Sequence, residues 1–427
     1  MKRLGIFVLL LALVGTGVFS GGRNDRSDGK NRVTIFAWAD SNELAVREQT
    51  IELINRKLAS QNIVVEASWL PPADVDAKLD AALNAGNAGD IIMMSPDWYG
   101  LRSKWFEDLG PYYRKDNIDT GVVYLPGVFD NYVLANGMVE AVPYTGNSMV
   151  LAYNKDIFDR AGVPYPRAGW TWEDFAAIVS RLTSGSGVNK IYGCTDSGLV
   201  FTRIYPLMFG GSIYDANWRV HLNEPNSIRG ASFLYDLTQQ GYLPDQNITN
   251  TMAAGDLFVA GKAAMYPMPG WEATGRAEAI GGNFNWDMVV LPNNADGRPA
   301  GTLFLTGYAM STASRAKDAA WEALKLLSID KEVMDLTCQI ALPSFKDSAE
   351  NVYGKTNIRG TQISNKPFVD GFAAGFVNPY GGAIARVEAA TTRAWERIFL
   401  MGENPQTVIP QLATEMQTIF DDYQKTW

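Results

Sequence analysis

The sequence predicts an α/β protein made of two or three domains, or of two large lobes. Its 427 residues exceed the roughly 150 residues that a single domain usually contains. Hydrophobic residues make up 47% of the chain, which is enough to fill packed cores. Short apolar segments alternate with segments of helical periodicity. This alternation is typical of βαβ units and indicates a mainly parallel sheet.

The N-terminal part of the chain contains three predicted strands separated by two predicted helices. The strands are short apolar runs at residues 33–38 (VTIFAW), 63–69 and 90–94 (DIIMM). Residues 42–60 have apolar side chains near the spacing of 3.6 residues that marks a helix. Residues 75–84 form the second predicted helix, and the glycines that follow at positions 86 and 89 mark its end.

In the middle of the chain, short apolar runs predict further strands at residues 139–143 (VEAVP) and 149–153 (MVLAY). Residues 171–174 (TWED) have the pattern of a capping box and open a helix that runs to residue 182. A second helix covers residues 226–240 and starts just after a proline, which is favoured in the first helical turn.

The C-terminal part predicts two strands and then mainly helices. Residues 263–268 form a strand, and the following Pro-Gly-Trp turns into a helix. Residues 302–311 (TLFLTGYAMS) form a strand that returns toward the first sheet. The remaining predicted helices cover residues 316–327, 331–340, 383–400 and 410–424.

Residues 1–20 have the features of an export signal. Lys2 and Arg3 precede an apolar run at residues 5–14 that is too short to span a bilayer comfortably. Small residues at positions 18 and 20 suit a cleavage site. An N-terminal membrane anchor is the weaker alternative, because the polar, glycine-bearing residues 21–32 read as a flexible leader. We therefore expect an exported protein.

Charge and composition argue against several classes of function. The net charge of -9 disfavours a nucleic-acid-binding surface, which needs clustered Lys and Arg. The single histidine, His221, excludes a multi-histidine metal site and has no catalytic motif around it. Cys194 and Cys338 are too few for a four-cysteine zinc site, and we expect two unpaired, buried thiols. We expect no metal and no cofactor.

The usual catalytic motifs are missing from the sequence. Residues 255–263 come nearest to a phosphate-binding loop, but the glycine spacing is wrong and Ala263 stands where Ser or Thr is needed. Neither the G-x-S-x-G nor the H-E-x-x-H motif occurs. A glycosidase needs only two carboxylates placed together in space, so a secreted carbohydrate-active enzyme remains an alternative.

Five segments carry a resemblance to a known family. The most specific one has a strand ending in Tyr-Asn-Lys, then Ala-Gly-Val-Pro, then Thr-Trp-Glu-Asp and a helix. Because all five segments follow one another in the family's order, the chain resembles the family 1 extracellular solute-binding proteins of ABC importers, the maltose-binding-protein-like class. The segments are VTIFAWADSNE after the leader and residues 89–116, 139–183, 258–271 and 306–327.

The resemblance implies a two-lobe periplasmic binding protein fold of type II, an α/β fold with the ligand cleft between the lobes. It implies an N-terminal lobe of residues 33–143 plus about 302–342 and a C-terminal lobe of 144–301 plus about 343–427. It also implies that the lobes close on a mono- or oligosaccharide, which is delivered to an ABC permease without catalysis. We expect a monomer. A non-sugar solute such as glycerol phosphate is the other alternative.

One departure from the family bears on localisation. Many relatives end the signal with a cysteine that tethers them to the membrane, whereas Ser20 stands near that position here. We therefore expect a free periplasmic protein without a lipid anchor.

Candidate ligand-binding residues follow from the position of loops after strands. Ligands of α/β sheets lie beyond the carboxyl ends of strands, and a sugar needs flat aromatic surfaces with a few polar groups. The candidates are Trp38, Asp40, Asp97, Trp98, Tyr144, Asn147, Trp271, Gly307 and Tyr308. For each aromatic residue the alternative is core packing, and for each aspartate it is a helix cap. A phosphorylated ligand would need arginine in the cleft to bind its phosphate group, and the candidates are Arg203 and Arg386.

Overall fold

The computed structural model describes residues 29–41, 43–95, 102–134, 136–196, 201–215, 217–372, 375 and 383–425. The predicted export signal and most of the predicted leader lie outside these residues. Within the described part of the chain, no helix combines the length and the apolar character that a membrane span requires.

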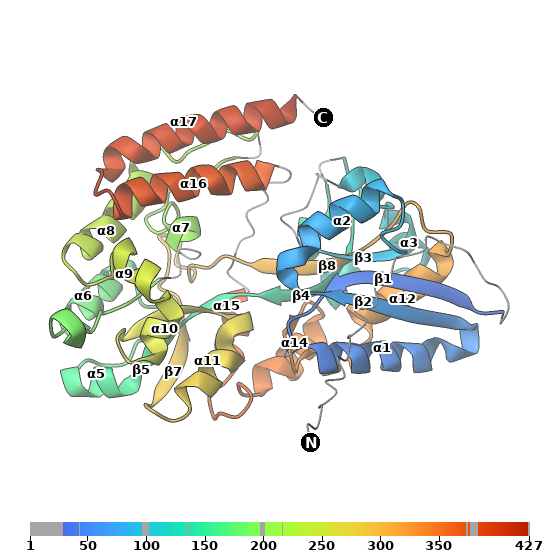
Figure 1. The fold of residues 1–427 in the computed structure, drawn as a ribbon, viewed down its shortest axis with the longest axis horizontal. Coiled ribbons are helices and arrows are strands. Elements are labelled where there is room, and N and C mark those ends of the chain that lie inside the picture. The colour runs from blue at the N-terminus through green and yellow to red at the C-terminus, as the bar shows by residue number, and fades with distance from the viewer. Residues whose placement is uncertain are drawn as a thin grey trace, which may run out of the picture.

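A six-stranded sheet forms the part of the molecule that we call the N-terminal lobe, at the right of Figure 1. Strand β1 pairs in parallel with β2 and β3, whereas β8 runs antiparallel to both β3 and β4. The order is β2-β1-β3-β8-β4-β9. The strands are β1 (Asn31–Trp38), β2 (Ile63–Leu70), β3 (Ile91–Met94), β4 (Val142–Asn147), β8 (Phe304–Met310) and β9 (Leu342–Pro343).

The predicted βαβ units are present at the start of this lobe. Helix α1 (Leu44–Leu58) connects β1 to β2, and α2 (Val75–Asn84) connects β2 to β3. The two helices lie on opposite sides of the sheet (Figure 1). Such crossovers force their strands to be parallel, which explains why the parallel pairs are confined to this segment.

A three-stranded sheet, in the order β6-β5-β7, forms the C-terminal lobe. Its strands are β5 (Met149–Asn154), β6 (Met265–Pro269) and β7 (Trp286–Val290). Both pairs are antiparallel, so the prediction of a mainly parallel sheet is wrong for this lobe. The reason is connectivity: α11 connects β6 to β7, which run in the same direction, but β5 lies between them and runs in the opposite direction.

Helices surround both sheets. In the C-terminal lobe, α16 and α17 lie side by side above the other helices (Figure 1). The further helices are α3 (Gly110–Lys115), α4 (Thr120–Val123), α5 (Lys155–Ala161), α6 (Trp172–Leu182), α7 (Phe201–Ile204), α8 (Pro225–Gln239), α9 (Gln246–Thr251), α10 (Ala254–Val259), α11 (Ala273–Ile280), α12 (Lys317–Ile329), α13 (Lys331–Thr337), α14 (Lys346–Asn351), α15 (Lys366–Phe372), α16 (Ile384–Phe399) and α17 (Pro405–Gln424).

The predicted capping box of α6 is confirmed. The hydroxyl of Thr171 accepts the backbone N–H of Asp174 at 3.2 Å, and the Asp174 carboxylate accepts the backbone N–H of Thr171 at 2.9 Å. These bonds satisfy two donors that a helix start leaves unpaired. The start of α8 at Pro225 also agrees with the prediction.

Two apolar clusters fill the interior. One runs from the N-terminal sheet across to one face of the C-terminal sheet, from Ile35 through Leu305 to Met288. The other lies on the opposite face of the C-terminal sheet and includes Phe175 and Phe420.

The strand predicted at residues 302–311 corresponds to β8, and it joins the N-terminal sheet as expected. The expected lobe boundaries stay a prediction.

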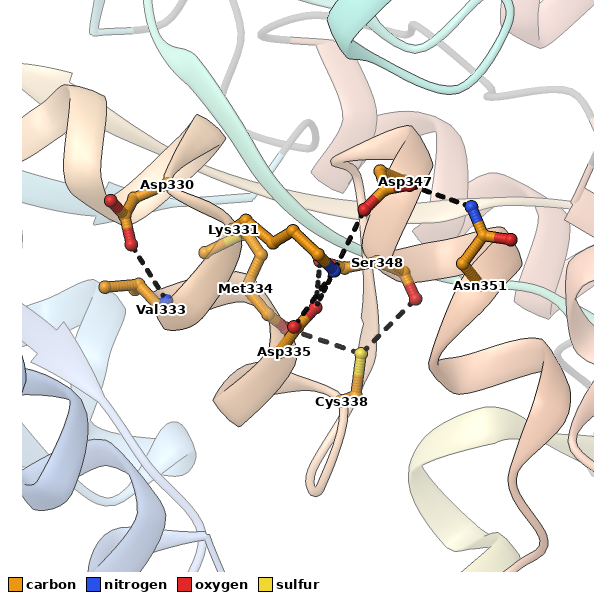
Figure 2. Close-up of polar contacts among 9 residues, drawn as sticks. All are labelled: Asp330, Lys331, Val333, Met334, Asp335, Cys338, Asp347, Ser348 and Asn351. Atoms are coloured by element: carbon orange, nitrogen blue, oxygen red, sulfur yellow. Dashed lines mark hydrogen bonds and ion pairs between the residues drawn. The ribbon is translucent and has the colours of Figure 1, made fainter.

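A polar cluster ties α13 to α14 where β9 lies between them (Figure 2). The ammonium group of Lys331 contacts the carboxylates of Asp335 and Asp347 at 3.0 and 2.9 Å. The hydroxyl of Ser348 donates to Asp335 at 2.6 Å. These contacts hold both flanks of β9 together.

Neither cysteine forms a disulfide, as predicted. Cys194 is buried, but Cys338 is only half-buried, at the lower edge of the cluster in Figure 2. Burial raises the pKa of the Cys338 thiol to about 12, so this thiol is protonated at neutral pH.

The half-buried Asp116 at the C-terminal end of α3 provides a test of pH-dependent stability. The Asp116 carboxylate accepts hydrogen bonds from Lys325 at 2.7 Å and from the Trp321 indole at 2.8 Å. These bonds, that of Lys325 first, lower the pKa of Asp116 below its usual value. Because the folded pKa is depressed, the stabilisation is present above the unfolded pKa and is lost as the pH falls through the folded pKa.

We expect Asp116→Asn to lower the free energy of unfolding by about 1–3 kcal/mol at pH 7, because it removes a charged acceptor. The difference from wild type should shrink below pH ~4, where free aspartate becomes protonated. Urea denaturation at pH 7 and pH 3 measures both values. Glu52→Gln, an exposed change of the same charge on α1, is the control. Equal effects of the two substitutions at pH 7 would contradict the expectation.

Candidate ligand-binding site

Trp271 stands out because its large aromatic side chain is exposed. It lies in a short 3₁₀ turn, Gly270–Glu272, between the end of β6 and the start of α11. Its side chain is 36% exposed, and no other Phe, Tyr or Trp among the described residues reaches that exposure. An indole face left open to solvent at the carboxyl end of a strand is available for a ligand.

Trp271 meets the two strands that cross between the lobes. Its ring packs edge-on against Phe304, the first residue of β8, with the ring centroids 5.0 Å apart. Phe304 pairs in turn with Asn147, the last residue of β4. A Cβ on Gly270 would lie 2.7 Å from the Asn147 side-chain oxygen. Glycine at position 270 therefore allows the turn to approach β4 closely.

Two charged residues complete this group from the helices of the C-terminal lobe. The Arg203 guanidinium of α7 lies 4.7 Å from the centroid of the Phe304 ring. Arg203 also forms an ion pair with Glu388 of α16.

Arg386, the other arginine proposed for a phosphorylated ligand, pairs with Asp422 at 3.3 Å on the exposed face of α16. Each arginine therefore has a carboxylate partner.

The structure places Tyr144 and Tyr308 in the core of the N-terminal lobe. Each is 1% exposed, and their ring centroids lie 5.0 Å apart. The guanidinium of Arg47 packs 5.7 Å from the Tyr144 ring centroid and forms an ion pair with Glu43 at 2.8 Å. Burial raises the pKa of the Tyr308 hydroxyl, which therefore stays protonated. Both tyrosines thus occupy the core-packing position that was the alternative to ligand contact.

Gly307 permits a close approach, as expected, but by a neighbouring side chain. A Cβ at this position would lie 2.4 Å from the Tyr132 ring and 2.7 Å from the carbonyl oxygen of Val142. Gly307 is therefore a packing position between β8 and β4.

The remaining candidates lie around the end of β1. Trp38 is the last residue of β1 and is half-buried against the N-terminal core. Asp40 is exposed, and its backbone carbonyl accepts the N–H of Glu43. Glu43, and not Asp40, is the N-cap residue of α1. Asp97 and Trp98 lie outside the described residues.

Of the predicted site residues, Asn147 and Trp271 therefore share Phe304 as a neighbour, whereas Tyr144, Gly307 and Tyr308 are grouped in the core. The sequence analysis did not select Phe304 or Glu388. Phe304 opens a strand whose pairing partner lies far away in sequence, and Glu388 meets Arg203 across 185 positions. No local pattern marks such contacts.

Known proteins resemble this chain in sequence and in fold. Residues 46–332 match the family model described as bacterial extracellular solute-binding protein. A maltotriose-binding protein of Pyrococcus abyssi is 23% identical over 361 residues, which cover 82% of this chain and 73% of that protein. An sn-glycerol-3-phosphate-binding periplasmic protein of Brucella abortus is 24% identical over 245 residues, covering 52% of this chain and 51% of the relative.

The fold has close structural neighbours. An ABC substrate-binding protein from Listeria monocytogenes, solved in complex with cycloalternan, superimposes with a TM-score of 0.77. The superposition covers 92% of this chain and 99% of the neighbour, at 20% sequence identity. At this identity the likeness establishes the fold.

Gly307→Ala tests the packing between β8 and β4. We expect it to lower the free energy of unfolding by about 1–3 kcal/mol, because a Cβ overpacks against Tyr132 and the backbone. Gly275→Ala is the matched control: the position is exposed within α11, and a Cβ meets nothing within 4 Å. There alanine should stabilise by about 1 kcal/mol. Chemical denaturation measures both, and a Gly307→Ala protein as stable as wild type would contradict this packing.

Proposed function

Because the chain belongs to the bacterial extracellular solute-binding protein family, we propose that it captures a carbohydrate and delivers it to an ABC import permease. The observation that carries the proposal is the exposed indole of Trp271, which packs on Phe304 at the junction of the two crossing strands, where Phe304 pairs with Asn147. A sugar ring has apolar C–H faces and a rim of hydroxyls, so it suits a flat aromatic surface with a neighbouring polar group.

The relatives support a carbohydrate ligand. One is described as binding maltotriose, and a structural neighbour was solved with cycloalternan. Trp38 and Asp40 at the end of β1, together with Asp97 and Trp98, remain our proposed contacts from the N-terminal lobe.

Binding would act through closure of the two lobes. A ligand that touches Trp271 on one lobe and the loops after β1 and β3 on the other gains its full set of contacts only in the closed form. The ligand therefore shifts the population toward closure, and the closed monomer docks on the permease. The export signal expected at residues 1–20 would place this capture in the periplasm. No bond of the ligand is broken.

Glycerol phosphate is the second candidate, because some relatives are described as binding it. A phosphate group needs cationic donors, and Arg203 already pairs with Glu388. A phosphate would have to compete with that carboxylate, whereas a neutral sugar would not. This ion pair favours the carbohydrate.

A ligand screen tests the proposal. Thermal-shift and calorimetric measurements with mono- and oligosaccharides, glycerol 3-phosphate, polyamines and peptides should give stabilisation by at least one saccharide. Stabilisation by a non-sugar alone would overturn the carbohydrate assignment. Mass analysis of oligosaccharides after incubation should recover them intact, and cleavage products would instead support the enzyme alternative.

Trp271→Ala tests the site itself. We expect the affinity for the selected saccharide to fall by at least about tenfold, since a tryptophan at a binding hot spot contributes about 2 kcal/mol or more. Trp271→Phe keeps an aromatic face and should lose less. Calorimetry measures both, with the melting temperature as a check on folding. Unchanged binding by Trp271→Ala would remove this residue from the site.

A further inference from the structure

A cavity of about 350 Å³ lies inside the C-terminal lobe, next to the turn that carries Trp271. It is bounded by α7, α8, α9, α10, β6, α11 and α16. Glu272, which directly follows Trp271, lines it, whereas Trp271 itself does not. None of the residues predicted from the sequence belongs to this cavity.

One wall of the cavity is aromatic. Trp395 and Phe399 of α16 contribute rings whose centroids are 4.6 Å apart, and Phe201 of α7 adds a third ring. Trp395 is only half-buried, so part of its surface remains open toward the cavity. Such rings can stack on the apolar face of a small ligand.

The polar part of the lining is built around Glu272. The Tyr266 hydroxyl and the Nε of Arg276 both donate to the same Glu272 oxygen, Oε2, each at 2.9 Å. Within the described part of the chain, no hydrogen bond reaches the other oxygen, Oε1. Arg276 also pairs with Asp256, and Asp196 lines the same cavity, so carboxylates outnumber the arginine here. This part of the lining therefore offers acceptors and carries no excess positive charge.

A second acceptor lies in Gln246 at the start of α9. Its side-chain oxygen is buried and has no hydrogen-bond partner among the described residues, and the residue lines the cavity. A buried acceptor without a donor is unfavourable, and a hydroxyl donor on a ligand would satisfy it.

The chemistry of the cavity selects its ligand. Its volume is near the lower end of the roughly 300–1,000 Å³ of small-molecule sites, which suits one ring-sized unit. A lining that combines acceptors with aromatic rings suits a molecule with hydroxyl donors around an apolar face. The excess of carboxylates over Arg276 disfavours an anion. A neutral sugar unit meets all three conditions.

We propose that this cavity binds the terminal unit of an oligosaccharide whose next unit lies on Trp271. The inference rests on the proposed function and narrows the ligand to chains longer than a monosaccharide. Glu272 and Trp271 are neighbours in the chain, with Cα atoms about 3.8 Å apart. The same short turn would therefore contact one sugar unit in the cavity and the next unit on the indole.

A plugged cavity tests this inference. Asn250 lines the cavity from α9 and is exposed, so Asn250→Trp places a large ring at its edge without disturbing the core. Asn247→Trp, at an exposed position of the same helix outside the cavity lining, is the matched control. Calorimetry compares both variants with wild type over one saccharide series from mono- to tetrasaccharide.

We expect Asn250→Trp to lose about tenfold or more in affinity for the longest saccharide, which corresponds to about 1.4 kcal/mol, and less than about twofold for the shortest one that binds. Asn247→Trp should match wild type throughout. Glu272→Gln should reproduce the length-dependent loss, because it removes the charged acceptor. Melting temperatures verify folding of each variant.

Two results would overturn the inference while the proposed function stands. In one, wild type binds saccharides and Asn250→Trp binds every length equally well. In the other, the variant loses the same factor at every length. If no saccharide binds wild type, the proposed function fails as well.

Discussion

The pairing of β4 with β8 is the constraint on which the rest of the molecule depends. Both strands cross between the lobes, and they are hydrogen-bonded neighbours in the N-terminal sheet. Asn147 and Phe304 face each other at the end of this pair, where the C-terminal lobe begins. The same pairing brings Trp271 and Arg203 to Phe304, so the candidate site exists only because these two strands lie together.

This junction combines a rigid base with an open surface. Tyr144, Tyr308 and Arg47 fill the space beneath the crossing strands, and Gly307 lets Tyr132 pack against them. Close-packed interiors resist deformation, so motion of the lobes has to take place beyond this base. Trp271 lies on the far side of the junction with its ring exposed, where closure would bring a ligand against it.

Helices and caps that depend on residues close together in the sequence could be predicted. Helix α2 has the predicted bounds, and the capping box of α6 forms as expected. Strand β7 (WDMVV) was missed, because Asp287 interrupts it and leaves only three consecutive apolar residues. Tyr144 was ambiguous since β4 is buried on both faces for most of its length, so its pattern does not show which side chains reach a cleft. Contacts such as Arg203 with Glu388 depend on tertiary packing.

We expect a saccharide to close the two lobes, and a distance between the lobes measures this closure. Spin labels on Lys78→Cys in α2 and Thr392→Cys in α16, both exposed and in different lobes, report the distance between them (Figure 1). Cys338→Ala removes the half-buried native thiol, and Cys194 is buried. We predict a single, shorter distance when a saccharide saturates the protein. An unchanged distance distribution at a saturation verified by calorimetry would contradict the account.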